Sequence, residues 1–146
     1  MSTPLLLLLL LICCTWMAAI GWYVGLVHYP AFRLISREHW RTFHSMHSTF
    51  TGVLVLIPML AQVALTFLVA QQTSLPFPAK AVLVVLMIFS VGWTFLISGP
   101  LHQKMADQDE KAINLLIWTN TPRAVAWTLQ ALFCGILLNA VQTLPG

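Results

Sequence analysis

Four of the five histidines lie at the ends of long apolar segments, where imidazole could bind a metal ion or a cofactor. His44 and His47 are three residues apart, so a helix would place them about one turn apart on one face. Neutral imidazole is the commonest metal ligand in proteins. Together with His28 and His102, this pair predicts an all-nitrogen site suited to copper, zinc or iron, including the iron of haem. The alternative is that each histidine is hydrated and bonds nearby loop carbonyls.

A second polar group, later in the chain, suits an anion or an oxygen atom better than a metal. Asn120, Arg123 and Trp127 follow one another at helical spacing and so predict one polar face. A guanidinium repels a divalent cation but binds a lipid phosphate, a haem propionate or the oxygen of a reduced quinone. Arginine beside histidine therefore favours haem or a quinone-like ligand over a bare metal. The alternative is that the side chain of Arg123 extends to a membrane surface.

The composition predicts that these residues belong to an integral membrane protein. Of 146 residues, 59% are apolar and 8% are charged, and the mean hydropathy is +0.85. A soluble domain carries about 25% charged residues. The net charge of +3 comes from a few basic residues beside apolar segments, which does not indicate a nucleic-acid partner. Cys13, Cys14 and Cys134 lie inside apolar segments and predict neither a disulfide framework nor a thiolate metal site.

Four apolar segments are long enough to cross a membrane, since a span needs about 20 residues. They run from about 5–27, 47–70, 79–98 and 122–141. The short connections predict an all-α, antiparallel four-helix transmembrane bundle that forms one domain, residues 1–146. The last segment is interrupted by Asn120, Pro122 and Arg123, which leaves two interpretations open. We favour a separate interfacial helix over Asp107–Thr119 before the span; the alternative is one long kinked helix over Asp109–Val141.

Positively charged residues predict the orientation of the bundle. The connections after the first and third spans, with the start of the fourth, hold six basic residues: Arg33, Arg37, Arg41, Lys104, Lys111 and Arg123. The opposite side holds Lys80 alone. Since positive residues gather in cytoplasmic loops, this distribution predicts a plasma (inner) membrane protein with both termini outside the cytoplasm.

Each predicted span carries one stripe of polar or small residues at helical spacing. Gly21 and Gly25, in the first span, belong to a small-residue stripe of the kind that lets helices approach closely in lipid. Polar stripes that face lipid are unfavourable, so we expect the polar faces to turn toward one another. These faces hold His44, His47, Ser48 and Thr51 in the second span and Thr94, Ser98 and His102 in the third. We therefore expect a polar cavity at the cytoplasmic end, lined by His28, His44, His47, His102, Asn120 and Arg123 and shaped by Trp127.

Five short stretches carry a resemblance that extends over most of the chain. They are His28-Tyr29-Pro30-Ala31-Phe32, Phe43-His44-Ser45-Met46-His47, Pro58-Met59, Gly99-Pro100-Leu101-His102 and Asn120-Thr121-Pro122-Arg123-Ala124-Val125-Ala126-Trp127. As a set they resemble a family of small, uncharacterised bacterial four-span membrane proteins. The resemblance implies the four-span topology and the choice of polar residues, and it implies no activity. Gln62 and Gln130 stand where the family leads us to expect glutamate and arginine, and Pro122 stands where it has an ordinary helix former.

Two functions are consistent with these patterns. The first is a redox-type membrane protein that holds haem, a transition metal or a quinone-like ligand in the cytoplasmic-side cavity. The second is a non-catalytic subunit or assembly factor of a larger membrane complex, whose polar stripes would bind other membrane subunits. In both, the lipid bilayer is the main partner of the chain, and neither hypothesis assigns a reaction.

Overall fold

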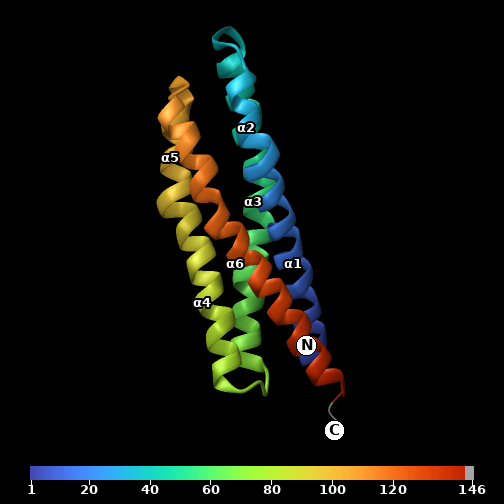
Figure 1. Cartoon of the computed structure of the whole chain (residues 1–146). Helices are drawn as coiled ribbons and strands as arrows, with labels where there is room; N and C mark the ends of the chain where they lie inside the picture. Colours follow the sequence, from blue (N-terminus) through green and yellow to red (C-terminus); the bar gives the residue numbers. More distant parts are fainter. Residues whose placement is uncertain (144–146) are drawn as a thin grey trace.

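Four long helices run antiparallel along the whole length of the molecule in the computed structural model, which describes residues 1–143 (Figure 1). The start of α1 and the end of α6 lie at one end, and the two short helices α2 and α5 lie toward the other (Figure 1). The elements in chain order are α1 (Thr3–Tyr23), η1 (Val24–His28), α2 (Tyr29–Ala31), η2 (Phe32–Leu34), α3 (Arg37–Gln72), α4 (Phe77–Trp93), η3 (Thr94–Ser98), α5 (Gly99–Lys104), η4 (Met105–Asp107) and α6 (Glu110–Thr143). The prediction of an all-α four-helix bundle is confirmed.

Four continuous helical segments of the described chain are long and apolar enough to cross a membrane: Thr3–Leu34, Arg37–Gln72, Phe77–Asp107 and Glu110–Thr143. They contain 31 to 36 residues each, so they are roughly 50 Å long at the usual helical rise. The hydrocarbon layer is only about 30 Å thick. Each helix therefore continues past the predicted span, and the chain fits an integral membrane protein whose helix ends reach into the head-group regions.

The preferred interpretation of the fourth segment is wrong, because α6 is one continuous helix that runs through Pro122. Asn120 does not cap a new helix. Its amide instead donates a hydrogen bond to the carbonyl oxygen of Gly21 on α1, at 2.7 Å. The indole nitrogen of Trp93 donates to the carbonyl oxygen of Thr119, at 2.7 Å, in the turn that precedes the proline. Pro122 leaves the carbonyl of Trp118, four residues earlier, without its usual donor, and the contacts of Thr119 and Asn120 join the same turn to neighbouring helices.

The two halves of the chain repeat one pattern of elements. A long helix, a π-helical turn, a short helix, a 3-10 turn and a second long helix follow one another in α1–α3 and again in α4–α6. In both halves a proline, Pro30 or Pro100, lies two residues after the π-helical turn. The residue before each proline donates its backbone N–H across five residues, from Tyr29 to Val24 and from Gly99 to Thr94. The wider turn accommodates the proline, whose ring would otherwise clash with the preceding turn of an α-helix.

The helices α1 and α6 cross in close contact, and this pair forms the centre of the bundle (Figure 1). Leu6, Leu10 and Cys14 of α1 pack against Ala131 and Cys134 of α6 in a fully buried cluster near the end that carries the termini. Farther along, a Cβ atom placed on Gly21 would lie 3.2 Å from Ala124 and 3.3 Å from Trp127. Small residues thus bring these two backbones together, as the small-residue stripe predicted.

We expect the α2/α5 end of the bundle to face the cytoplasm, because the positive charges gather there. A phosphatase reporter that is active only outside the cytoplasm should be active when fused to the C-terminus. It should be inactive when inserted at Asp109, between η4 and α6. An insertion at Ser74, between α3 and α4, is the matched control and should be active. The opposite pattern of activities would overturn the proposed orientation.

The close contact of α1 with α6 predicts that Gly25 does not tolerate a larger residue. A Cβ atom at this position would overlap the side-chain amide of Asn120. Gly25→Ala should therefore destabilise the bundle by about 1–3 kcal/mol, measured from the unfolding midpoint in detergent. Gly135→Ala is the control, because a Cβ atom there meets nothing within 4 Å and alanine favours a helix. Equal midpoints for the two variants would contradict this account of the packing.

Candidate intramembrane ligand site

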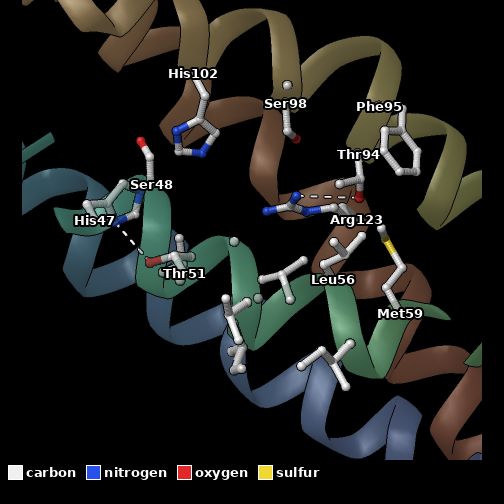
Figure 2. Close-up of a pocket in the computed structure, with 18 of the residues that line it drawn as sticks. His47, Ser48, Thr51, Leu56, Met59, Thr94, Phe95, Ser98, His102 and Arg123 are labelled. Atoms are coloured by element: carbon white, nitrogen blue, oxygen red, sulfur yellow. Dashed lines mark hydrogen bonds between the residues drawn. The ribbon is translucent and has the colours of Figure 1, made fainter. Parts of the chain in front are cut away.

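A cavity of about 500 Å³ lies between α3 and the η3–α5 segment, with its inner wall formed by α1, η1 and α6 (Figure 2). Leu56 of α3 and Phe95 of η3 line it and are also exposed on the outer surface of the bundle, by 45% and 58% of their area. Since both residues belong to membrane-spanning segments, the cavity opens sideways toward lipid. Its volume is within the range of pockets that hold small organic ligands.

The two ends of the cavity differ in chemistry. His47 and His102 lie at one end, and Leu56 and Met59 lie toward the other, with Arg123 between them (Figure 2). Hydroxyl groups add to the polar side: Ser48, Thr51, Thr94 and Ser98 all line the cavity. Ile20, Val24, Val53, Val55 and Ile57 add to its apolar walls. The site therefore matches a molecule with a polar head and an apolar body.

The histidines contact one another at the polar end. One ring nitrogen of His28 and one of His47, Nε2 and Nδ1, share a hydrogen bond of 2.7 Å. The rings of His47 and His102 stack, with centroids 5.3 Å apart and planes inclined by 22°. His102 Nε2 shares a 2.9 Å hydrogen bond with the hydroxyl of Tyr29, and His44 Nε2 lies 3.2 Å from the carbonyl oxygen of His102. Only His47 and His102 of the four line the cavity.

These contacts do not form the predicted metal site. Within residues 1–143, no group of three or more His, Cys, Asp or Glu side chains is arranged to hold a metal ion. The physical reason is that the imidazoles bond or stack with one another. A shared metal needs several nitrogen atoms pointing at one position, about 2.0–2.1 Å from it. In this conformation His28, His44, His47 and His102 are therefore not joint ligands of one metal.

Arg123 lies inside the bundle, with only 5% of its area exposed, so the alternative that it extends to the membrane surface is wrong. Its guanidinium donates a 2.6 Å hydrogen bond to the side-chain oxygen of Asn120 and approaches the hydroxyl of Thr94 at 3.5 Å. It also lies over the indole of Trp127, 5.1 Å from the ring centroid, in a cation–π contact. These contacts hold the charge at the cavity wall.

The predicted set and the observed lining overlap in part. Trp127 and Arg123 line the cavity, together with His47 and His102. Asn120 is buried behind Arg123, and His28 and His44 lie outside the cavity, so these three predicted positions are wrong for direct lining. The prediction missed Tyr29, a fully buried tyrosine that lines the cavity and bonds His102. Its place in the His28-Tyr29-Pro30 stretch was the available signal.

Three buried polar side-chain atoms have no hydrogen-bond partner in the described part of the chain: Nε2 of His47, Oγ of Ser98 and Nε of Arg123. All three residues line the cavity. Each is at least nine-tenths buried, with 4%, 2% and 5% of its area exposed respectively. Buried polar groups are almost always paired, and leaving one unpaired costs about 1–3 kcal/mol. They come from α3, η3 and α6 around one cavity, which makes this cavity the candidate ligand site.

The inner wall of the cavity continues into a network that is fully hydrogen-bonded. Trp127 Nε1 donates to the side-chain oxygen of Gln62 at 3.1 Å, and Gln62 donates in turn to Gln130 at 2.6 Å. Gln130 donates to the hydroxyl of Thr66 and the carbonyl oxygen of Leu83, at 3.4 Å and 3.3 Å. This neutral network holds Trp127 in place and gives the glutamines a structural role.

Comparisons of the chain with protein-family profiles, with curated proteins and with solved structures return no match. The fold and the cavity therefore define the class on their own. The chain is a four-helix membrane bundle with a cavity at the depth of its spans.

The glutamine network predicts strong coupling between Gln62 and Gln130. Gln62→Leu removes the acceptor of Trp127 and the donor to Gln130, so it should destabilise the bundle by about 1–3 kcal/mol. In Gln62→Leu/Gln130→Leu, the second substitution removes a group that the first left unpaired. The double variant should therefore lose about 1–2 kcal/mol less than the two single losses combined. Unfolding in detergent measures the cycle, and simple additivity would contradict the network.

Proposed function

We propose that the protein binds a quinone-like amphiphile from the bilayer, in a redox role, with its oxygen-bearing head at the polar end of the cavity. The observation that carries this proposal is the set of three unpartnered polar atoms of His47, Ser98 and Arg123, three residues that line one cavity. A carbonyl or hydroxyl oxygen is a suitable partner for each. The arginine Nε–H donates, the serine hydroxyl donates or accepts, and the imidazole nitrogen does either according to its tautomer.

The charge of the site favours this head group. Arg123 supplies a buried positive charge, and no acidic residue lines the cavity in the described part of the chain. A cationic ligand would be repelled and would find no carboxylate to pair with. An oxygen that is neutral in one state and negative in another, as in a quinone and its reduced form, suits a fixed guanidinium in both states.

The route of entry supports an apolar body. The cavity opens between Leu56 and Phe95 on the side of the bundle that faces lipid. A ligand that enters there must already be dissolved in the membrane. Its tail can remain between the helices or in the lipid while the head reaches Arg123.

Haem fits the residues less well. A haem iron held between two histidines needs one imidazole on each side, both pointing at the iron. The rings of His47 and His102 are stacked almost parallel, and Nε2 of His102 already bonds Tyr29. The two rings therefore do not face each other across a space that an iron atom would occupy. A quinone-like head needs only one hydrogen bond from His47 and no second imidazole opposite it.

The wider setting of the function is part of the same proposal. The resemblance to bacterial four-span membrane proteins and the distribution of positive charge support a plasma-membrane location with the polar end of the cavity on the cytoplasmic side. Binding and orientation of the ligand are the roles that these side chains support directly.

Arg123→Leu is the variant that tests the proposed site. The wild-type protein in lipid nanodiscs should bind a decyl-substituted benzoquinone, and equilibrium dialysis measures the affinity. Loss of the charged donor should weaken binding by about tenfold to a hundredfold. Ser98→Ala, which removes one hydroxyl without altering the packing, should weaken binding by a smaller factor. Lys111→Leu, an exposed cation of the same helix outside the cavity, is the control and should bind like the wild type.

Three results would overturn this proposal. One is equal quinone affinity in Arg123→Leu and the wild type, with circular dichroism showing that both are folded. Another is a Soret band or a stoichiometric metal in the purified protein that is lost in His47→Ala, which would identify haem or a metal as the ligand. A third is a wild type that binds no quinone but purifies with a partner subunit in fixed ratio, which would favour the subunit hypothesis.

A further inference from the structure

The hydrogen bond between His28 and His47 joins the cavity to the outside of the bundle. His47 lines the cavity, its buried Nε2 has no hydrogen-bond partner in the described part of the chain, and its Nδ1 lies 2.7 Å from Nε2 of His28. His28 is the last residue of η1, does not line the cavity and is only partly buried. One end of this pair is thus inside the ligand site, and the other is at the surface near the charged end of the molecule.

The contact between the two rings restricts their protons. A neutral imidazole carries one proton, on either nitrogen. A hydrogen bond between two ring nitrogens needs a proton on one of them and a lone pair on the other. If His28 donates, His47 must hold its own proton on Nε2. If His47 donates, its Nε2 is a bare base, and His28 holds its proton on Nδ1.

We propose that His28 and His47 form a proton relay between water at the α2 end of the bundle and the ligand in the cavity. The proposal rests on the proposed function, because the ligand is the final acceptor. To protonate a ligand oxygen, His47 releases the proton of Nε2 while its Nδ1 receives the proton of His28 Nε2. A water molecule then returns one proton to His28 at Nδ1. One proton enters, one leaves, and both rings end neutral in their other tautomer.

The reverse sequence removes a proton from the ligand by the same bonds. The two tautomeric states of the pair are therefore an acid and a base at one position, which a ligand that gains and loses protons requires. The hydroxyl of Thr51 also lies near His47 Nδ1, at 3.0 Å (Figure 2). It shares the single proton or lone pair of this nitrogen with His28, which is the nearer partner at 2.7 Å.

The neighbours of the pair favour this route over others. The other cavity histidine, His102, directs Nε2 at the hydroxyl of Tyr29, which is 1% exposed and so does not reach water. His28 instead stands among the aromatic rings of Tyr23, Phe32 and Phe43, which hold it against His47. Those rings offer no ring nitrogen that could replace it. His28 is thus a positioning and relay residue, and His47 is the member of the pair that contacts the ligand.

The test uses a ligand whose own protonation is visible. A 2-hydroxy-3-alkyl-1,4-naphthoquinone changes its absorbance when the hydroxyl ionises. The nanodisc-embedded protein is loaded with this probe, and a rapid pH jump starts its protonation.

His28→Phe keeps the aromatic packing and removes the relay. It should slow protonation of the bound probe by about a hundredfold, with an affinity within about twofold of the wild type. His44→Gln, in the same region but outside both relay and cavity, should keep the wild-type rate.

Chemical rescue separates a relay from a structural role. His28→Ala leaves space at the surface, so added imidazole should restore much of the lost rate in a concentration-dependent way. Imidazole should not accelerate the wild type. A wild-type rate in His28→Phe, or a slow His28→Ala that imidazole does not rescue, would overturn the relay while leaving the binding proposal intact.

Absence of probe binding in the wild type would count against the proposed function instead. In that case the relay is tested by proton exchange in the ligand-free protein. With ¹⁵N-labelled histidine, the imidazole N–H of His47 should exchange with water more slowly in His28→Phe than in the wild type. Equal exchange would also overturn the relay.

Discussion

The structure depends on how a buried guanidinium is accommodated inside an apolar bundle. Arg123 lies at the depth of the spans, where an uncompensated charge is strongly unfavourable. Asn120 resolves much of this problem, because its oxygen accepts from Arg123 while its amide nitrogen donates to the carbonyl of Gly21. The same asparagine therefore stabilises the charge and joins α6 to α1. It can do so only because Gly21 and Gly25 lack side chains at the crossing.

This arrangement explains the polarity of the cavity. The partners of Arg123 within the bundle bond each of its terminal nitrogens and leave Nε, which is buried, without a partner in the described part of the chain. Trp127 covers one face of the guanidinium and is itself held by Gln62. The charge is thus fixed in place, and in the proposed complex it is a preorganised donor for a ligand oxygen. Such preorganised donors in a site of low dielectric constant interact more strongly than the same groups in water.

Helix number, antiparallel order and the inward direction of most polar stripes could be predicted, because each depends on local composition and helical spacing. The histidine spacing correctly placed His47 and His102 on facing helices, but it could not show that their rings stack instead of converging on a metal. Pro122 misled the prediction for a related reason. A proline argues for a helix end when only the chain itself is considered. In the structure α6 continues through Pro122, and this region is held by tertiary contacts: Trp93 donates to the carbonyl of Thr119, and Asn120 donates to the carbonyl of Gly21. The role of each polar side chain depends on its hydrogen-bond partner, and the tertiary fold determines which partner it meets.

The repeated π-helical turns give the two halves of the chain comparable geometry and different chemistry. His28 and Ser98 occupy the same position, the last residue of η1 and of η3, each two residues before a proline. In the first half this position holds an imidazole bonded to His47, and in the second half it holds a hydroxyl that faces the cavity. A wider turn changes the direction of the side chains that follow, and such turns are frequent at functional sites. A bundle of two parallel hairpins therefore has two equivalent positions near its polar end. Divergence of these two positions is sufficient to give the proposed relay group, His28, and the proposed ligand-binding group, Ser98, equivalent places in the two halves.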